Sequence, residues 1–150
     1  MRTLVIGYGN DSRNDDGIGW YVVAELAKRA LPEVMLETAH QLEVEFVETV
    51  RDYDRVVFVD AAVPESLTPW SSEDVRPGFQ SHAIAHYLTP ADLLGLCRTL
   101  YGHAPSGVLV SIRGHDFNFG AVFSEETQLA AQAVIEHIVA LVTQPELETA

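Results

Sequence analysis

The residues most suited to chemistry lie in the stretch GYGNDSRNDDGIG, residues 7–19, between a short apolar run and a predicted helix. Gly7 and Gly9 supply the first half of a dinucleotide-binding fingerprint, but Ser12 occupies the position of its third glycine. Three acids lie in the same turn: Asp11, Asp15 and Asp16. Their negative charge disfavours a pyrophosphate, which such folds bind through bare backbone amides. The stretch therefore favours a cation site over a nucleotide-binding α/β domain.

Two adjacent aspartates open the predicted helix. An aspartate at a helix N-terminus satisfies unpaired backbone amides and complements the helix dipole, which is worth about 1 kcal/mol. Capping therefore accounts for one of the two acids and leaves the other available for function. We expect Asp15 to cap the helix and Asp16 to face a crevice, although the sequence also permits the reverse.

A further acid, Asp60, closes the apolar stretch RVVFVDA, residues 55–61. In open parallel sheets, ligands bind in the crevice outside the carboxyl ends of the strands, and the turn after the first strand opens onto the same crevice. Asp16 and Asp60 are therefore predicted to be neighbours, and two carboxylates there repel each other unless a cation or a shared proton relieves them. An equally weighted alternative is that Asp60 only caps the following turn.

A third ligand would complete a metal site, and the chain has six histidines. His82 and His86 lie four residues apart, and His115 lies in the stretch RGHDFNFG. The HxxxH spacing is that of a helical metal pair, but the glutamate of the metalloprotease arrangement is missing. Spacing alone does not select a ligand among these histidines.

The elements that must position these residues alternate between apolar runs rich in branched residues and segments of helical period. Strands are predicted at 3–8, 34–39, 55–61 and 107–112, and helices at 18–30, 42–50, 89–100 and 124–143. Residues 62–88 are predicted to form a long irregular segment that walls one side of a groove, with EDV at 73–75 as a candidate edge strand. This order predicts an α/β three-layer sandwich, in which helices cover both faces of a mostly parallel twisted sheet. A single domain over residues 1–150 is expected.

Charge and composition exclude several classes of partner. Twenty-two acids against nine Lys and Arg give a net charge of -13 and a pI near 4.6, which disfavours nucleic acid and anionic membrane surfaces. The sequence has no run approaching the ~20 apolar residues that span a bilayer. The single cysteine, Cys97, cannot form an internal disulfide and is expected in the core. These features predict a cytoplasmic location.

Three stretches, LVIGYGNDSRNDDGIGWYVVAEL, VVFVDA and HYLTPADLLGL, together resemble the hydrogenase maturation endopeptidases. That family trims the carboxyl terminus of the nickel-iron hydrogenase large subunit after nickel insertion. The resemblance extends from about residue 3 to 142 and implies that Asp16, Asp60 and His86 contact the metal, whereas His82 has no place in the pattern. Among relatives the first ligand can be a glutamate, which reaches one methylene further than Asp16.

The resemblance also implies a reaction. Two carboxylates and an imidazole suit a divalent ion such as nickel or zinc, and the nickel is expected to be supplied by the hydrogenase large-subunit precursor. Asp16 or Asp60 would help to activate water, and no organic cofactor is expected.

The amide of Asn10 would hold the glycine turn or bind the substrate backbone, unless Asn10 is simply a turn former. The competing prediction is a non-catalytic checkpoint or chaperone that senses nickel loading.

Overall fold

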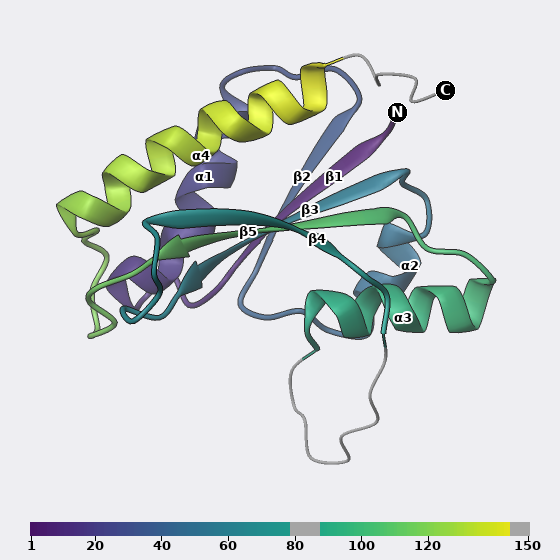
Figure 1. The fold of residues 1–150 in the computed structure, drawn as a ribbon, viewed down its shortest axis with the longest axis horizontal. Coiled ribbons are helices and arrows are strands. Elements are labelled where there is room, and N and C mark those ends of the chain that lie inside the picture. The colour runs from purple at the N-terminus through teal and green to yellow at the C-terminus, as the bar shows by residue number, and fades with distance from the viewer. Residues whose placement is uncertain (79–87, 145–150) are drawn as a thin grey trace.

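The computed structural model describes residues 1–78 and 88–144 and shows one five-stranded sheet (Figure 1). The strands are β1 (Thr3–Tyr8), β2 (Val34–Ala39), β3 (Arg55–Ala62), β4 (Trp70–Val75) and β5 (Ser106–Arg113). Their order across the sheet is β2-β1-β3-β5-β4. The first four strands of that order are parallel, and β4 is an antiparallel edge strand beside β5. The predicted α/β class and mostly parallel sheet are confirmed.

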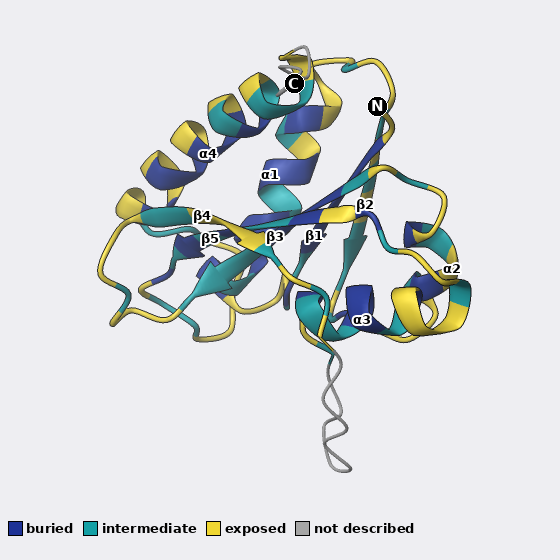
Figure 2. Ribbon diagram, turned by 45° about the vertical axis from the view of Figure 1, so that its right-hand side comes forward, coloured by how far each residue is buried: buried dark blue, intermediate teal, exposed yellow. Residues whose placement is uncertain are grey.

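Four α-helices cover the two faces of this sheet: α1 (Ile18–Ala27), α2 (Phe46–Val50), α3 (Pro90–Tyr101) and α4 (Glu125–Thr143). Helices α1 and α4 pack on one face, and α2 and α3 pack on the other (Figures 1 and 2). A short 3-10 helix, η1 (Asn14–Gly17), leads directly into α1. The result is the predicted three-layer sandwich.

The strands alternate their side chains between two hydrophobic clusters. In β1, Val5 points into the cluster beneath α1 and α4, whereas Leu4 and Ile6 point into the cluster beneath α2 and α3. In β3, Val57 points into the first cluster and Phe58 into the second, and all five side chains are fully buried. Burial on both faces explains why these strands read as continuous apolar runs instead of alternating ones. Cys97 belongs to the second cluster and is buried, as predicted.

Glycines let the start of α1 approach the sheet at backbone contact. A Cβ atom at Gly7 would overlap the carbonyl oxygen of Gly19. A Cβ atom at Gly19 would lie 2.7 Å from the carbonyl oxygen of Val59 and 3.0 Å from the backbone nitrogen of Tyr8. The helix therefore begins directly above the carboxyl ends of β1 and β3, which places the acidic turn at the edge of the sheet.

Helix α3 begins as the sequence predicts. The hydroxyl of Thr89 accepts a hydrogen bond from the backbone N–H of Asp92 at 3.1 Å, and the carboxylate of Asp92 accepts one from the N–H of Thr89 at 3.0 Å. This reciprocal pair is a capping box, and Pro90 occupies the first helical turn. Both devices fix the start of α3.

Two helices are shorter than predicted. The first ends at Ala27 instead of near residue 30, and the chain reaches the left-handed region at Ala30, with φ of 49°. The second begins at Phe46 instead of residue 42, because its first turn closes with i to i−3 hydrogen bonds such as Phe46 N–H to Glu43 O at 3.0 Å. Leu42 is buried all the same, from the segment before the helix.

The segment predicted as irregular, 62–88, contains β4, which is longer than the candidate strand at 73–75. Trp70 pairs with Ile112 and Val75 with Gly107, so β4 pairs with all of β5 except its two end residues. Among the described helices, none is both long and apolar enough to cross a membrane.

The close packing of α1 predicts the effect of one added methyl group. Gly19→Ala should lower the free energy of unfolding by about 2 kcal/mol, because the helix must move away from the carbonyl of Val59. Urea denaturation measures the change. Gly78→Ala is the control, since its added Cβ would meet nothing closer than 4.0 Å, and it should change stability by less than about 0.5 kcal/mol. Equal losses in the two variants would contradict this account of the packing.

Candidate functional site

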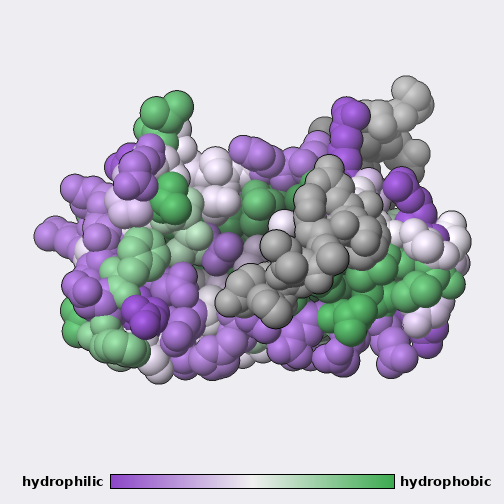
Figure 3. All heavy atoms as spheres, turned by 90° about the horizontal axis from the view of Figure 1, so that it is seen from below, coloured by the Kyte–Doolittle hydropathy of each residue, from purple (hydrophilic) through white to green (hydrophobic). Residues whose placement is uncertain are grey.

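A cavity of about 700 Å³ opens at the carboxyl ends of β1 and β3. Asp16 and Asp60 both line it, so the two acids predicted as neighbours share one pocket. Its apolar wall includes Leu42, Leu88 and Leu109. Figure 3 shows the side of the molecule that carries α2 and α3, where apolar atoms gather in separate patches on a largely hydrophilic surface. The pocket thus combines two carboxylates with apolar contact area, as ligand sites commonly do.

Asp60 is half-buried at the end of β3. Its Oδ1 accepts a hydrogen bond from the N–H of Ala61 at 2.8 Å, and the hydroxyl of Tyr8 donates to its side chain. Burial and the nearby charge of Asp16 raise the pKa of Asp60 to about 7, although these two hydrogen bonds act in the opposite direction. Asp60 can therefore exchange a proton near neutral pH.

Tyr8 is a site residue that sequence reasoning missed. It closes β1 and lines the pocket beside Asp60, with its side chain largely withdrawn from solvent. Burial, and then the charge and hydrogen bond of Asp60, raise the pKa of Tyr8 well above its usual range, so the hydroxyl remains a donor. The rule that singled out Asp60, a polar side chain at the carboxyl end of a buried strand, applies equally to Tyr8.

Asp16 is held by the glycine turn. Its Oδ2 accepts a hydrogen bond from the backbone N–H of Asn10 at 2.7 Å. Gly9 has φ of 140°, and a Cβ atom there would overlap the carbonyl oxygen of Asp16. A turn amide that a dinucleotide-binding loop would offer to phosphate is thus occupied by the protein's own carboxylate. This arrangement argues against nucleotide binding for the reason that the sequence suggested.

The side chain of Asn10 serves the turn. Its Oδ1 accepts a hydrogen bond from the N–H of Ser12 at 2.9 Å, which is the geometry of a turn former. Asn10 also lines the pocket, so the predicted contact with a substrate backbone remains a prediction.

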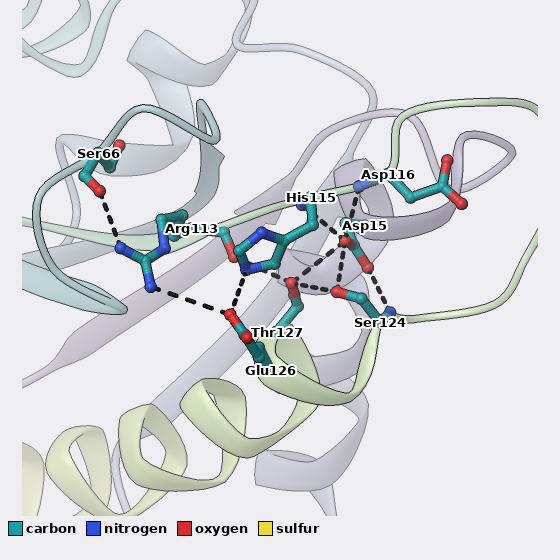
Figure 4. Close-up of polar contacts among 8 residues, drawn as sticks. All are labelled: Asp15, Ser66, Arg113, His115, Asp116, Ser124, Glu126 and Thr127. Atoms are coloured by element: carbon teal, nitrogen blue, oxygen red, sulfur yellow. Dashed lines mark hydrogen bonds and ion pairs between the residues drawn. The ribbon is translucent and has the colours of Figure 1, made fainter.

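Asp15 has a different role from the predicted helix cap, and that prediction was wrong. It is fully buried, and Gly17 occupies the N-cap position of α1. The carboxylate of Asp15 crosses to the far end of the chain, where it accepts hydrogen bonds from the N–H groups of His115 at 2.8 Å, Asp116 at 3.0 Å and Ser124 at 2.8 Å (Figure 4). The hydroxyl of Ser124 also donates to it at 2.7 Å.

These contacts explain why the chain tolerates a buried carboxylate. Burial would raise the pKa of Asp15, but the hydrogen bonds from His115, Ser124 and Asp116 together lower it below its usual value. Ser124 is also the N-cap residue of α4, so the charge lies beside the positive end of that helix. Asp15 therefore joins the start of α4 to the turn that presents Asp16.

The predicted third ligand, His86, lies outside the described residues, as does His82. Leu88 and Thr89, which follow that segment, line the pocket. His115 is not among the lining residues of this pocket and contacts Glu126 instead. Within residues 1–78 and 88–144, no three His, Cys, Asp or Glu side chains gather closely enough to hold a metal ion.

Two of the three predicted metal ligands lie in the described part of the chain, and their chemistry suits a divalent ion. Asp16 and Asp60 supply two carboxylates to one pocket, and carboxylate oxygens ligate divalent ions of many kinds. The repulsion that helps to raise the pKa of Asp60 is what a bound cation would relieve. The pocket has two further cationic or titratable side chains that the sequence did not single out, Arg13 and His40.

His40 lies beside the glycine turn through an aromatic contact. Its ring meets that of Trp20 edge to face, with 5.6 Å between ring centres, and the indole N–H of Trp20 donates to the carbonyl of Gly9 at 3.0 Å. The histidine follows β2 directly, so only the parallel pairing of β2 with β1 brings it to the pocket. Spacing in the sequence gave no sign of this neighbourhood.

Comparison with protein-family models gives no match to the sequence, and comparison with curated proteins gives none either. Solved structures do match. The [NiFe] hydrogenase maturation protease HycI from Thermococcus kodakarensis is 23% identical with a TM-score of 0.73, and the match covers 95% of this chain and 93% of that one.

Two structures from Escherichia coli are similar to the same extent. The hydrogenase maturating endopeptidase HybD is 21% identical with a TM-score of 0.75, over 94% of this chain and 91% of that one. An endopeptidase solved in solution is 25% identical with a TM-score of 0.73, over 93% and 91% of the two chains. The protein therefore has the fold of these maturation proteases over nearly its whole length.

The two adjacent acids predict unequal losses of stability. Asp15→Asn should lower the free energy of unfolding by about 3 kcal/mol, because an amide nitrogen would face donors at a buried site. Asp16→Asn should cost less than about 1 kcal/mol, since its remaining carbonyl oxygen can still accept from Asn10. Urea denaturation at pH 7 compares the two. A loss in Asp16→Asn as large as that in Asp15→Asn would contradict the structural role assigned to Asp15.

The raised pKa of Asp60 predicts a pH-dependent stability in the metal-free protein. In the folded protein the Asp60 carboxyl keeps its proton up to about pH 7, whereas in the unfolded chain it loses the proton near pH 3.8. Stability associated with this group is therefore present at low pH and is lost as pH rises toward 7. Asn cannot ionise, so Asp60→Asn removes the cost of holding a charged carboxylate at this position. The substitution should therefore stabilise the protein more at pH 8 than at pH 5, by about 1–2 kcal/mol.

Urea denaturation at both pH values measures this gain. Asp52→Asn is the matched control, because Asp52 is an exposed acid that does not line the pocket, and its 3.9 Å pair with Arg51 is a surface contact that contributes little to stability. A gain from Asp60→Asn that is equal at pH 5 and pH 8 would contradict the assignment.

Proposed function

We propose that the protein is an endopeptidase that removes the carboxyl-terminal extension of a nickel-iron hydrogenase large-subunit precursor after nickel insertion. The observation that carries this proposal is the pair Asp16 and Asp60 in one pocket of a fold shared, over more than nine-tenths of the chain, with proteins named hydrogenase maturation proteases. The sequence resemblance described above points in the same direction.

In this proposal, Asp16, Asp60 and His86 recognise nickel that the precursor already carries. The ion is then part of the substrate, and two carboxylates with one imidazole add ligands of the kind that nickel accepts. A precursor without nickel would lack the charge that relieves the repulsion between Asp16 and Asp60. Cleavage would thus depend on prior insertion of the metal.

The chemistry proposed for the chain's own residues is general-base catalysis. With a pKa of about 7, Asp60 can take a proton from water at neutral pH, and the water oxygen then attacks the scissile carbonyl carbon. The carbon–nitrogen bond breaks, and the departing nitrogen receives the proton. The hydroxyl of Tyr8 orients the Asp60 carboxylate for this step through its hydrogen bond. No serine or cysteine nucleophile is required, and Cys97 is buried in the core.

The substrate peptide is proposed to lie in the pocket in extended form. Its walls offer Leu42, Leu88 and Leu109 for apolar side chains and Asn10 for the peptide backbone. Residues 40 and 41, which also line the pocket, directly follow the edge strand β2, so an extended segment could add to that edge. We propose that the reaction takes place in the cytoplasm, without nucleic acid or membrane partners.

Mixing the pure protein with purified precursor tests the proposal directly. The large subunit should lose the mass of its extension when the precursor carries nickel and should keep its mass when it does not, as mass spectrometry would show. Asp16→Asn and Asp60→Asn should reduce the cleavage rate by at least about 100-fold, since each removes a charge at the site. Asp52→Asn should cleave at the normal rate.

The histidines provide a further matched pair. His86→Ala should abolish cleavage, whereas His82→Ala should retain it, because only His86 occupies the place of a ligand in the family pattern. If the wild-type protein leaves the mass of both the nickel-loaded and the nickel-free precursor unchanged and still associates stably with the precursor, the non-catalytic checkpoint is favoured instead. Full activity of Asp16→Asn or Asp60→Asn would remove that residue from the site.

A further inference from the structure

A second cavity, of about 500 Å³, lies between the start of α4, the end of β5 and the start of β4. It shares no lining residue with the pocket that holds Asp16 and Asp60. Its polar end is formed by Arg113, His115 and Glu126, and its apolar wall by Trp70, Leu129 and Ala133. Its volume is within the range of sites for small ligands.

The polar end contains an arginine with unused hydrogen-bonding capacity (Figure 4). One terminal nitrogen of Arg113 donates to the carbonyl of Ser66 at 2.9 Å, and the other lies 4.0 Å from the carboxylate of Glu126, which is beyond hydrogen-bonding distance. The Nε of Arg113 is buried without a hydrogen-bond partner among the described residues. Such groups are costly to leave unsatisfied.

Glu126 pairs with Arg113 only at 4.0 Å and lies closer to His115. The Nε2 of His115 lies 3.1 Å from Glu126, whose side chain is 71% exposed, whereas the side chain of Arg113 is only 22% exposed. The acid therefore stands at the rim of the cavity and the guanidinium lies further in. The inner polar group is a donor with a positive charge, which calls for an anionic acceptor.

The apolar wall requires a ligand with a hydrophobic part next to that acceptor. Leu129 lies one turn after Glu126 on the same face of α4, lines the cavity and is 64% exposed. Trp70 faces it from β4 and is fixed by its ring contact with His137, at 5.0 Å between ring centres. Both side chains offer apolar surface to a ligand in this cavity.

We propose that this cavity binds the free carboxyl end of a peptide whose last residue is aliphatic. The terminal carboxylate accepts from Arg113 and the aliphatic side chain packs between Trp70 and Leu129. This site is separate from the proposed proteolytic pocket, and its occupation does not depend on cleavage.

Titration of the full chain with acetyl-Ala-Ala-Leu, followed by amide and indole NMR signals, tests the proposal. Shifts should concentrate at Trp70, Arg113 and residues 126–133, and the peptide with a free carboxylate should bind about tenfold more tightly than its carboxamide. Equal binding of the acid and the amide, no binding, or shifts centred on Asp16 and Asp60 would overturn it. The result is independent of whether any precursor is cut.

Two exposed leucines give a matched pair of variants. Leu129→Glu places a negative charge beside the proposed carboxylate and should weaken binding about tenfold, while its exposure leaves folding unaffected. Leu100→Glu, on α3 and 60% exposed, adds the same charge away from the cavity and should bind the peptide normally. Arg113→Gln should remove the preference for the acid over the amide. Equal weakening by the two leucine variants, or a preference that survives Arg113→Gln, would overturn the assignment.

Discussion

The buried carboxylate of Asp15 is the constraint on which the rest of the site depends. It is a charge without solvent, and the fold can hold it only by supplying N–H donors from His115, Asp116 and Ser124. Those donors come from a loop and a helix start that are about a hundred residues away in sequence. Satisfying Asp15 therefore requires the segment after β5 to fold against the acidic turn. The position of Asp16, the next residue, follows from that closure.

The neighbouring acids thus divide into a structural one and an available one. Asp15 receives enough hydrogen bonds to keep its pKa low despite burial, whereas Asp16 receives one from Asn10 and faces the pocket. At Asp60, in contrast to Asp15, burial and the charge of Asp16 outweigh two hydrogen bonds and raise the pKa to about 7. The same type of side chain therefore has a lowered pKa at Asp15 and a raised pKa at Asp60, because the two surroundings differ. Only the pair in the pocket retains capacity for a cation or for a proton.

The sequence predicted those features that depend on local chemistry and on the general rules of parallel sheets. The buried strands, the capping box at Thr89 and the meeting of Asp16 with Asp60 at one edge follow from composition, spacing and topology. The sequence could not show the role of Asp15, because its partners are distant in the chain and most of them are backbone amides that no residue type reveals. His40 escaped notice for a related reason, since it reaches the pocket only through the register between β2 and β1.

The order of strands has a consequence for how the chain is made. Strand β5, which separates β3 from β4 in the sheet, is the last of the five to leave the ribosome. Until it emerges, β4 has no neighbour with which to form a ladder, and an unpaired strand can associate with other nascent chains. The centre of β4 reads Ser71, Ser72, Glu73 and Asp74, which is polar enough to remain solvated. Charged side chains on an edge strand disfavour pairing with another chain, so the acids of β4 oppose such association before the sheet is closed.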